Sequence, residues 1–126
     1  NVYCEQDQFC AFSKIICPTG RGNHQCNIVA KGTSWILHRS QVLCPDEGIC
    51  NVHLGAIDSY GWIHNIARLT EFWIGSNGTL NLFCHGDGQD FDTCGHVDIY
   101  QRPHSDLFLD CNGFESCDSI RNYFTS

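Results

Sequence analysis

The sequence predicts an all-β protein, a parallel β-helix (β-solenoid) whose turns are clamped by disulfides. Three observations lead to this fold class. The chain of 126 residues contains ten cysteines. Its apolar segments are short, rich in β-formers and separated by turn residues. A motif of apolar residues that run into a cysteine returns at a fixed spacing, and a period of about 20 to 50 residues is typical of solenoids.

The spacing of the motif defines one coil. Cys17 and Cys44 are separated by the same number of positions as Cys84 and Cys111. The two series lie about half a period from each other, which indicates two related turns in each repeat. We therefore expect coils of about 27 residues, between four and five of them, in a single cysteine-rich domain of residues 1–126.

Two positions in the series carry no cysteine. Ile57 stands one period before Cys84, and Ala30 stands one period before Ile57. Each is followed by a turn and then by a tryptophan, Trp35 or Trp62, where the second cysteine of a pair would stand. We expect these indole rings to be buried and to fill the volume that a cystine fills in other coils.

The residue two positions before the first cysteine of each pair is aliphatic in all five copies. Side chains alternate between the two faces of a strand, so this residue and the cysteine share a face. With strands stacked about 4.8 Å apart, inward residues form ladders along the axis. We expect Val2, Leu82 and Leu109 in one ladder, and Ile15 and Val42 in another.

The segment Ser59–Gly75 is ambiguous. Its apolar residues have roughly helical spacing, with Ser59 as a possible N-cap and Gly75 as a stop, at Trp62, Ile66, Leu69 and Trp73. The repeat instead predicts strands near Ile63–Ile66 and Phe72–Ile74. We follow the repeat; a helix here would be an insertion between coils.

Each first cysteine has a nearby partner across a turn that contains Gly, Pro, Asp or Asn. We therefore predict five local disulfides: Cys4–Cys10, Cys17–Cys26, Cys44–Cys50, Cys84–Cys94 and Cys111–Cys117. A competing scheme joins stacked cysteines one coil apart, such as Cys17–Cys44, since strand spacing lies in the usual cystine range. A high, even cysteine count indicates a secreted or cell-surface protein.

Composition limits the partners. The net charge of −7 without a Lys/Arg cluster argues against nucleic acid and anionic lipid. No apolar run approaches about 18 residues, so we expect no membrane insertion. Asn77-Gly-Thr is an N-glycosylation sequon and fits a secretory route. The sequence reads as a mature chain or a fragment.

Metal sites have weak signals. Asp87, Asp90 and Asp92 follow one another closely with glycine and could ligate calcium, but the EF-hand ligand order is missing. An acidic, solvated turn is the simpler interpretation. Three histidines could converge on zinc only through stacking, and surface histidines are the simpler interpretation for them too: His85, His96 and His104. We expect no metal and no cofactor.

Catalysis has no clear motif. Asp98 and Arg102, with the three aspartates above, resemble the outer-face residues of β-helix polysaccharide enzymes by composition only. The chain has no long loops to build a cleft, so we expect no enzyme and no catalytic residues.

Interface candidates come from position. Phe72 and Trp73 are adjacent, so on a strand one of them must face outward. No cap is evident at either end of the repeat, and uncapped strand edges favour stacking. The terminal candidates are Val2, Tyr3, Tyr123 and Phe124.

The alternation of l-x-C-x-G-x-x-x-C with I-x-C-P-turn-C-x-I resembles the cysteine-rich β-helix repeats of secreted and surface proteins of algae, oomycetes and related protists. It is similar to repeats in proteins of tubular flagellar hairs (mastigonemes). The resemblance covers nearly the whole chain and implies a glycosylated, extracellular structural protein without catalytic residues. The two Trp positions and the irregular segment Ile57–Leu82 depart from it.

Our first hypothesis is therefore a structural subunit of an extracellular filament or coat, assembling with itself or with related subunits through uncapped ends or faces. The alternative is a secreted carbohydrate- or protein-binding module, lectin-like or effector/toxin-like. Sugar binding would require an exposed row of aromatic residues, and an effector would be a capped monomer.

Overall fold

The computed structural model describes residues 1–4, 10–20, 22–32, 36–56, 66–86, 93–112, 117 and 119–125. These residues form ten β-strands, and no helix occurs among them. The strands are β1 (Val2–Cys4), β2 (Lys14–Ile16), β3 (His24–Gly32), β4 (Gln41–Leu43), β5 (Gly48–Ala56), β6 (Glu71–Ile74), β7 (Gly78–Gly86), β8 (Asp98–Gln101), β9 (Asp106–Asn112) and β10 (Arg121–Phe124).

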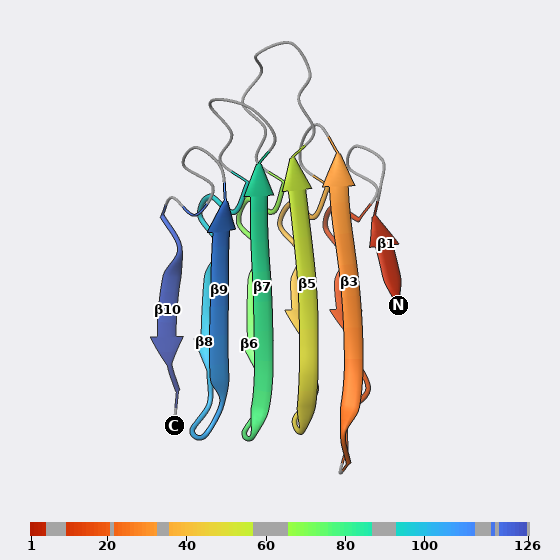
Figure 1. Cartoon of the computed structure of the whole chain (residues 1–126), viewed down its shortest axis with the longest axis vertical. Helices are drawn as coiled ribbons and strands as arrows, with labels where there is room; N and C mark the ends of the chain where they lie inside the picture. The colour runs from red at the N-terminus through yellow and green to blue at the C-terminus, as the bar shows by residue number, and fades with distance from the viewer. Residues whose placement is uncertain are drawn as a thin grey trace.

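Odd-numbered and even-numbered strands form two separate parallel sheets, which face each other (Figure 1). Sheet A has the order β1-β3-β5-β7-β9, and sheet B has the order β2-β4-β6-β8-β10. The chain alternates between the sheets, so each coil contributes one strand to each of them. The N-terminus lies at one end of the stack and the C-terminus at the other. The predicted parallel β-solenoid is confirmed.

The strand register gives the length of each coil. Val2, Ile28, Val52, Leu82 and Leu109 are aligned across sheet A. The step between them is shortest from Ile28 to Val52 and longest from Val52 to Leu82, and its average is the predicted period of about 27 residues. Five strands in each sheet agree with between four and five coils. Both predicted inward ladders are present, since Ile15 pairs with Val42 in sheet B.

One prediction from the fixed period is wrong. Cys84 is aligned with Leu54 and not with Ile57, although Ala30 and Cys4 do complete that ladder. The reason is that corner connections vary in length while the strands keep their pairing, so a constant step fails locally. Trp35, Ile57 and Trp62 lie outside the described residues, and the expected Trp rungs are untested.

The segment predicted to be ambiguous contains a strand. β6 covers Phe72 and Trp73, as the repeat predicted, and Ile66–Leu69 form a turn rather than a strand. The rest of the segment, residues 59–65, lies outside the described residues.

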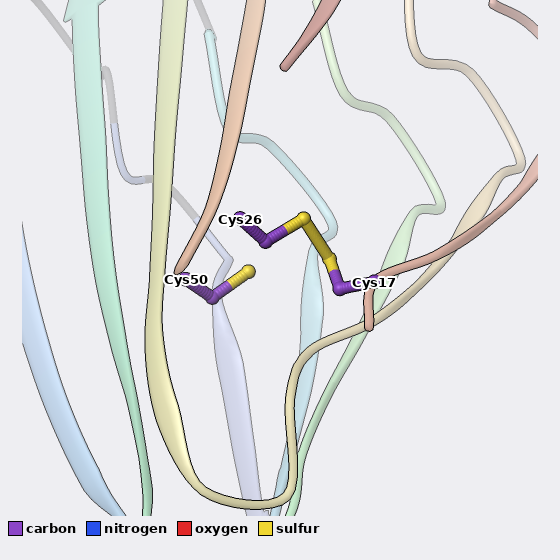
Figure 2. A group of neighbouring side chains, drawn as sticks. All are labelled: Cys17, Cys26 and Cys50. Atoms are coloured by element: carbon purple, nitrogen blue, oxygen red, sulfur yellow. A yellow bond between two sulfur atoms is a disulfide. The ribbon is translucent and has the colours of Figure 1, made fainter. Parts of the chain in front are cut away.

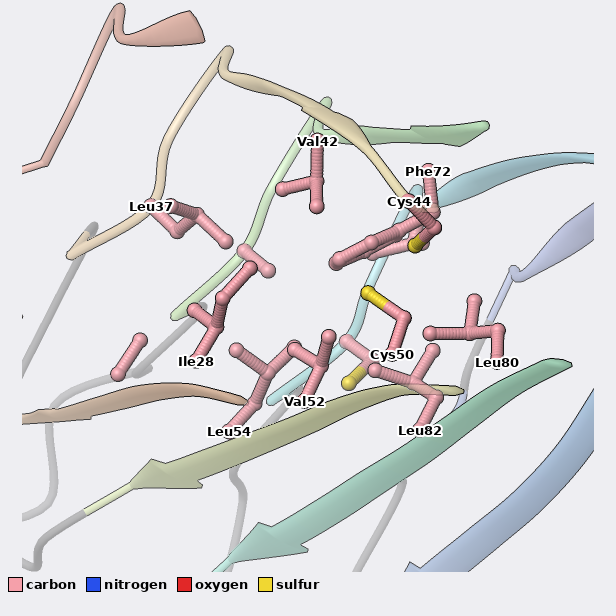
Figure 3. Packing of buried hydrophobic residues seen from close by; sticks show 14 of the residues in the cluster. Ile28, Leu37, Val42, Cys44, Cys50, Val52, Leu54, Phe72, Leu80 and Leu82 are labelled. Carbon is pink, nitrogen blue, oxygen red and sulfur yellow. The ribbon is translucent and has the colours of Figure 1, made fainter. Parts of the chain in front are cut away.

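The core lies between the two sheets. Inward side chains of sheet B, such as Val42 and Phe72, pack against Val52, Leu80 and Leu82 of sheet A (Figure 3). All five are fully buried. Burying an aliphatic or aromatic side chain of this size contributes about 1.5–3 kcal/mol, so the core stabilises the stack even though it is only two side chains thick.

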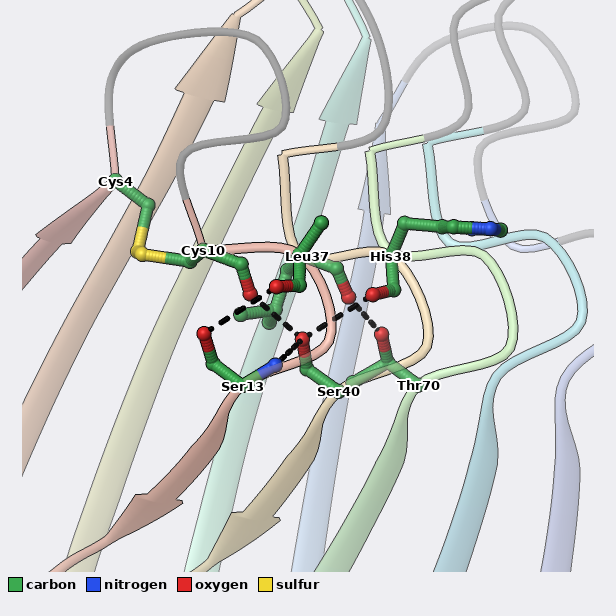
Figure 4. Close-up of a disulfide and its surroundings, with 8 residues drawn as sticks. Cys4, Cys10, Ser13, Leu37, His38, Ser40 and Thr70 are labelled. Atoms are coloured by element: carbon green, nitrogen blue, oxygen red, sulfur yellow. Dashed lines mark hydrogen bonds between the residues drawn. A yellow bond between two sulfur atoms is a disulfide. The ribbon is translucent and has the colours of Figure 1, made fainter.

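The corner that leads from sheet A to sheet B also stacks from coil to coil. The N–H of Cys10 donates to the carbonyl oxygen of Ile36 at 3.1 Å, and the N–H of Leu37 to that of Ile66 at 2.8 Å. Buried hydroxyls add further links: Ser40 Oγ donates to the Cys10 carbonyl at 2.7 Å, and Thr70 donates to the Leu37 carbonyl (Figure 4). Buried backbone groups at this corner are thus satisfied by the neighbouring coil.

Candidate functional site: the two ends of the solenoid

Four of the five predicted local disulfides are present in the structure. They are Cys4–Cys10, Cys17–Cys26, Cys84–Cys94 and Cys111–Cys117. The fifth, Cys44–Cys50, is a correction: both residues are buried free cysteines. The two thiols are hydrogen-bonded to each other instead, and this bond together with burial raises the pKa of Cys44 well above its ordinary value.

Exposed apolar side chains gather at the two ends of the stack. Nine large hydrophobic side chains are exposed in the described part of the chain, and seven of them belong to the first or the last coil. Those of the first coil (β1, β2) are Tyr3, Phe12 and Ile16, and those of the last coil (β9, β10) are Phe108, Leu109, Tyr123 and Phe124. The other two, Ile49 and Leu69, lie between the ends.

The exposure at the last coil includes residues that belong to the core ladder. Leu109 is aligned with Leu82, yet Leu109 is 42% exposed while Leu82 is 0% exposed. Cys111, aligned with the buried Cys84, is also exposed. In the described part of the chain, no further coil covers the last residue of either ladder. Exposed apolar side chains that cluster in this way are typical of a surface that binds a partner.

An aromatic stack on the outer face of sheet B ends in the same way. Trp73 and Tyr100 stack with ring centroids 4.1 Å apart and an 11° angle between planes, and Tyr100 stacks on Tyr123 at 5.1 Å and 17°. Because the three stacked rings cover one another's faces, mainly their edges are open to solvent. Phe72, the neighbour of Trp73, is fully buried, so of this pair only Trp73 remains an interface candidate.

A polar column runs beside this stack. Gln41 Nε2 donates to Glu71 Oε1 at 2.9 Å, and Trp73 Nε1 donates to the same atom at 3.2 Å. Arg121 pairs with Asp98 at 2.9 Å, and this hydrogen bond raises the pKa of the Arg121 guanidinium. Asp98, one of the residues that resemble those of β-helix enzymes by composition, thus forms an ion pair with Arg121.

The pKa of the Tyr100 hydroxyl is raised, mainly by burial and to a smaller extent by the negative charges of Glu71 and Asp98. The phenol therefore stays neutral over the physiological range, and the aromatic stack carries no charge of its own.

The outer face of sheet A carries an asparagine ladder. Asn27 Nδ2 donates to Asn1 Oδ1 at 3.1 Å, Asn51 to Asn27 at 3.0 Å, and Asn81 to Asn51 at 2.8 Å. The next member of this column is the exposed Phe108.

A histidine lies in the neighbouring column of the same face. His53 stacks on Phe83 with centroids 4.4 Å apart. Burial, together with the nearby Lys31 and His85, lowers the pKa of His53. This histidine is therefore mostly neutral near pH 7, which suits a ring stacked on Phe83.

One pocket lies where the corner from sheet B to sheet A meets the outer face of sheet B. It has a volume of about 160 Å³ and is lined by Thr19, Leu43, Cys44, Asp46, Trp73, Ile74, Gly75 and Arg102. It combines one indole with one acidic and one basic side chain, so it could hold a small polar ligand.

The described residues do not bring the predicted calcium or zinc ligands together. Asp87, Asp90 and Asp92 lie outside the described residues. His85 contacts Asp110 at 3.4 Å on the outer face of sheet A, while His96 and His104 lie in a corner and in a turn. Within the described ranges, one group of three cysteines converges, Cys17, Cys26 and Cys50, but the Cys17–Cys26 disulfide leaves only the Cys50 thiol as a possible ligand.

The sequon lies at a turn. Asn77 is exposed and has a φ of 66° between β6 and β7, where the N–H of Gly78 donates to the Gly75 carbonyl at 3.0 Å. The left-handed third position of a type II turn favours Asn or Gly, so Asn77 suits this turn and its amide is accessible to a glycan. No helix in the described part of the chain is long and apolar enough to cross a membrane.

Comparison of the chain with models of known protein families, with curated proteins and with solved structures found no match. The function is therefore inferred from the geometry of the molecule.

Sequence reasoning named Val2, Tyr3, Tyr123 and Phe124 at the ends but missed several members of the end surfaces. Those missed are Phe12, Ile16, Phe108 and Leu109, together with Tyr100 in the aromatic stack. A signal for the stack was present, since Trp73 and Tyr100 stand one period apart in the sequence. The exposed ends of the ladders carry no local signal, because each residue follows the same alternation as its buried counterpart.

Proposed function

We propose that this chain is a structural subunit of an extracellular filament or coat, in which solenoids stack end to end on further copies. The observation that carries the proposal is the concentration of exposed apolar side chains on the first and last coils. The disulfide-rich fold is compatible with an extracellular location. The contact is heterologous, so it extends into a filament unless the rotation closes a ring.

The repeat itself supports a second copy as the occupant. If β1 of one copy paired with β9 of another as neighbouring strands pair within the chain, Val2 would follow Leu109 and Cys4 would follow Cys111. Both ladders would continue with residues of the same kind, and the cystines Cys111–Cys117 and Cys4–Cys10 close loops of equal length. New strand pairs would also satisfy the free backbone groups of both edges.

Sheet B supports the same arrangement. Tyr123 would be followed by Ile16 of the next copy, which is apolar and exposed. Arg121 would be followed by Lys14, a like-charged pair, but Arg121 is already paired with Asp98, which reduces the repulsion. The net charge of −7 opposes association in general, so the apolar contact at the ends has to outweigh this repulsion.

Purified, non-reduced protein tests the proposal by analytical ultracentrifugation and negative-stain electron microscopy. We expect linear oligomers whose length grows with concentration. Leu109→Asp should abolish them, because a carboxylate would lie in the apolar contact. Ile49→Asp is the matched control: Ile49 is 43% exposed against 42% for Leu109, but it lies on a middle coil, and it should leave assembly intact.

A mixing experiment tests the polarity of the contact. Leu109→Asp blocks the last coil and Ile16→Asp blocks the first coil, so each variant alone should be monomeric. Mixed, they should form heterodimers through the two unblocked ends and nothing larger. A wild-type protein that stays monomeric at high concentration, or variants that do not complement each other, would contradict head-to-tail stacking.

A second candidate is a binding module for carbohydrate or protein, favoured by the pocket beside Trp73. Here the sugar would sit in the pocket, with Asp46 and Arg102 as hydrogen-bonding groups. The aromatic row itself is a poor sugar platform, because stacking occupies the ring faces that sugars need. Binding to a glycan array that is lost in Arg102→Ala, in a protein that remains monomeric, would favour this function over assembly.

A further inference from the structure

Three sulfur atoms meet in the core between the second and third coils. The Sγ atoms of Cys17, Cys26 and Cys50 all lie within 4.8 Å of one another, and all three residues are buried (Figure 2). Cys17 and Cys26 form a disulfide, while Cys50 is a free thiol. Figure 2 shows the Cys50 side chain directed toward this disulfide. A nucleophile and its target are thus enclosed in the same apolar space.

The strand register brings them together. Cys26 of β3 and Cys50 of β5 are direct partners in sheet A, so their Cα atoms are separated by about the strand spacing of 4.8 Å. This value lies inside the range that disulfides accept. Cys26 therefore has two possible partners: Cys17 across the corner of its own coil, and Cys50 in the next coil.

The remaining cysteine of this region supports the role of Cys50. Cys44 is hydrogen-bonded to Cys50 and keeps its proton. A thiol that keeps its proton is a poor nucleophile, so Cys44 does not compete with Cys50 for the Cys17–Cys26 disulfide.

We propose that Cys17, Cys26 and Cys50 form a thiol–disulfide exchange site, through which the disulfide moves between Cys17–Cys26 and Cys26–Cys50. The Cys50 sulfur, after losing its proton, attacks the Cys26 sulfur. The new Cys26–Cys50 bond forms as the Cys17–Cys26 bond breaks, and the Cys17 thiolate takes up a proton. One disulfide and two thiols are present before and after, so no oxidant or reductant is consumed.

The two pairings constrain different parts of the molecule. The Cys17–Cys26 disulfide closes the corner between β2 and β3, where the first coil leads into the second. Cys26–Cys50 joins β3 to β5 and ties two consecutive coils together. Exchange therefore moves a covalent link from a corner to the axis of the solenoid. This inference does not depend on end-to-end assembly, since all three residues are internal.

Disulfide mapping of the wild-type protein tests the inference. The protein is incubated without reductant at neutral and mildly alkaline pH, quenched with acid, alkylated with N-ethylmaleimide in denaturant and digested. Trypsin cleaves after Arg21 and so separates Cys17 from Cys26, and a Glu-specific protease cleaves after Glu47 and so separates Cys44 from Cys50. We expect a Cys26–Cys50 peptide with alkylated Cys17, formed faster at higher pH because exchange requires a thiolate.

Two variants provide matched controls, since each removes one free thiol. Cys44→Ser keeps a hydrogen-bond donor and the nucleophile, so exchange should persist. Cys50→Ser should leave only Cys17–Cys26. If Cys50→Ser does not fold, the wild-type time course decides alone. Mapping that finds only Cys17–Cys26 at every time and pH, or Cys50 bonded to Cys44 in the wild type, would overturn the proposal.

Discussion

At the residue scale, the stacking of the coils depends on positions where the backbones of two neighbouring coils come very close. Gly48 is the sharpest example. It has a φ of +129°, and a Cβ atom built on it would lie 2.0 Å from the carbonyl oxygen of His24 in the neighbouring coil. Both the backbone conformation and the missing side chain are required there. The corner between the sheets thus packs backbone against backbone at this point.

We predict that Gly48→Ala destabilises the protein by more than about 3 kcal/mol, since backbone strain adds to a steric overlap with main-chain atoms. Gly20→Ala is the control. Gly20 has a φ of +105° but nothing within 4 Å of its Cβ position, so only the strain of about 1–2 kcal/mol remains. Urea unfolding followed by tryptophan fluorescence measures both. Equal losses in the two variants would show that the close approach to His24 carries no cost.

The opposite corner uses left-handed residues that no sequence rule would select. Each coil has one such residue there, and none is glycine: Phe12, Arg39, Leu69, His96 and Ser119. The steps from each of them to the next equal the steps of the sheet B register. The N–H groups of Phe12, Arg39 and Leu69 each donate to a backbone carbonyl of the next coil, so inter-coil bonding holds this conformation against local preference.

At the element scale, the asparagine ladder shows how the outer face of sheet A stabilises its register. Asn51 lies in the middle of the ladder, donating to Asn27 and accepting from Asn81. A one-residue slip of β5 would turn these side chains into the core, so the ladder and the apolar inward residues specify the same register.

We predict that Asn51→Ala costs about 1–3 kcal/mol, because it removes two side-chain hydrogen bonds of about 0.5–1.5 kcal/mol each. Gln25→Ala, an exposed outward position of the adjacent strand β3, should change stability by less than about 0.5 kcal/mol. Thermal unfolding of both variants checks the difference. If Asn51→Ala behaved like Gln25→Ala, the ladder would be a geometric consequence of the register and not a source of stability.

At the scale of the whole molecule, disulfides supply a large share of stability. The four bridges join residues separated by 6, 9, 10 and 6 positions. In the chain-entropy model, loops of this size contribute together about 10 kcal/mol. This is comparable to the entire stability of a typical domain, about 5–15 kcal/mol, and the core between the sheets is thin.

We therefore predict that complete reduction unfolds the protein near room temperature. Far-UV circular dichroism in the presence of a phosphine reductant should show loss of the β-sheet signal, and the same buffer with spent reductant should not. Mass spectrometry after alkylation confirms that all bridges are open. A sheet signal that survives complete reduction would mean that the core and the inter-coil ladders suffice.

The sequence by itself determined the fold class, the coil length and four cystines. These are local properties: alternation with period two places Val2 and Cys4 on one face, and a short turn brings a cysteine to its neighbour. The prediction of a Cys44–Cys50 disulfide was wrong. Stacking of the coils brings the sulfur atoms of Cys17 and Cys26 close to Cys50, and closeness along the chain alone does not decide which sulfur atoms bond.

The tertiary structure alone decided the number of faces, the partner of each residue in the next coil and the exposure of the ends. Leu54 rather than Ile57 lies against Cys84 because corner lengths vary while strand hydrogen bonds fix the register. Leu82 and Leu109 occupy equivalent sequence positions, yet one is buried and the other exposed. Burial depends on whether another coil packs on the residue, and this is a property of the stack and not of the motif.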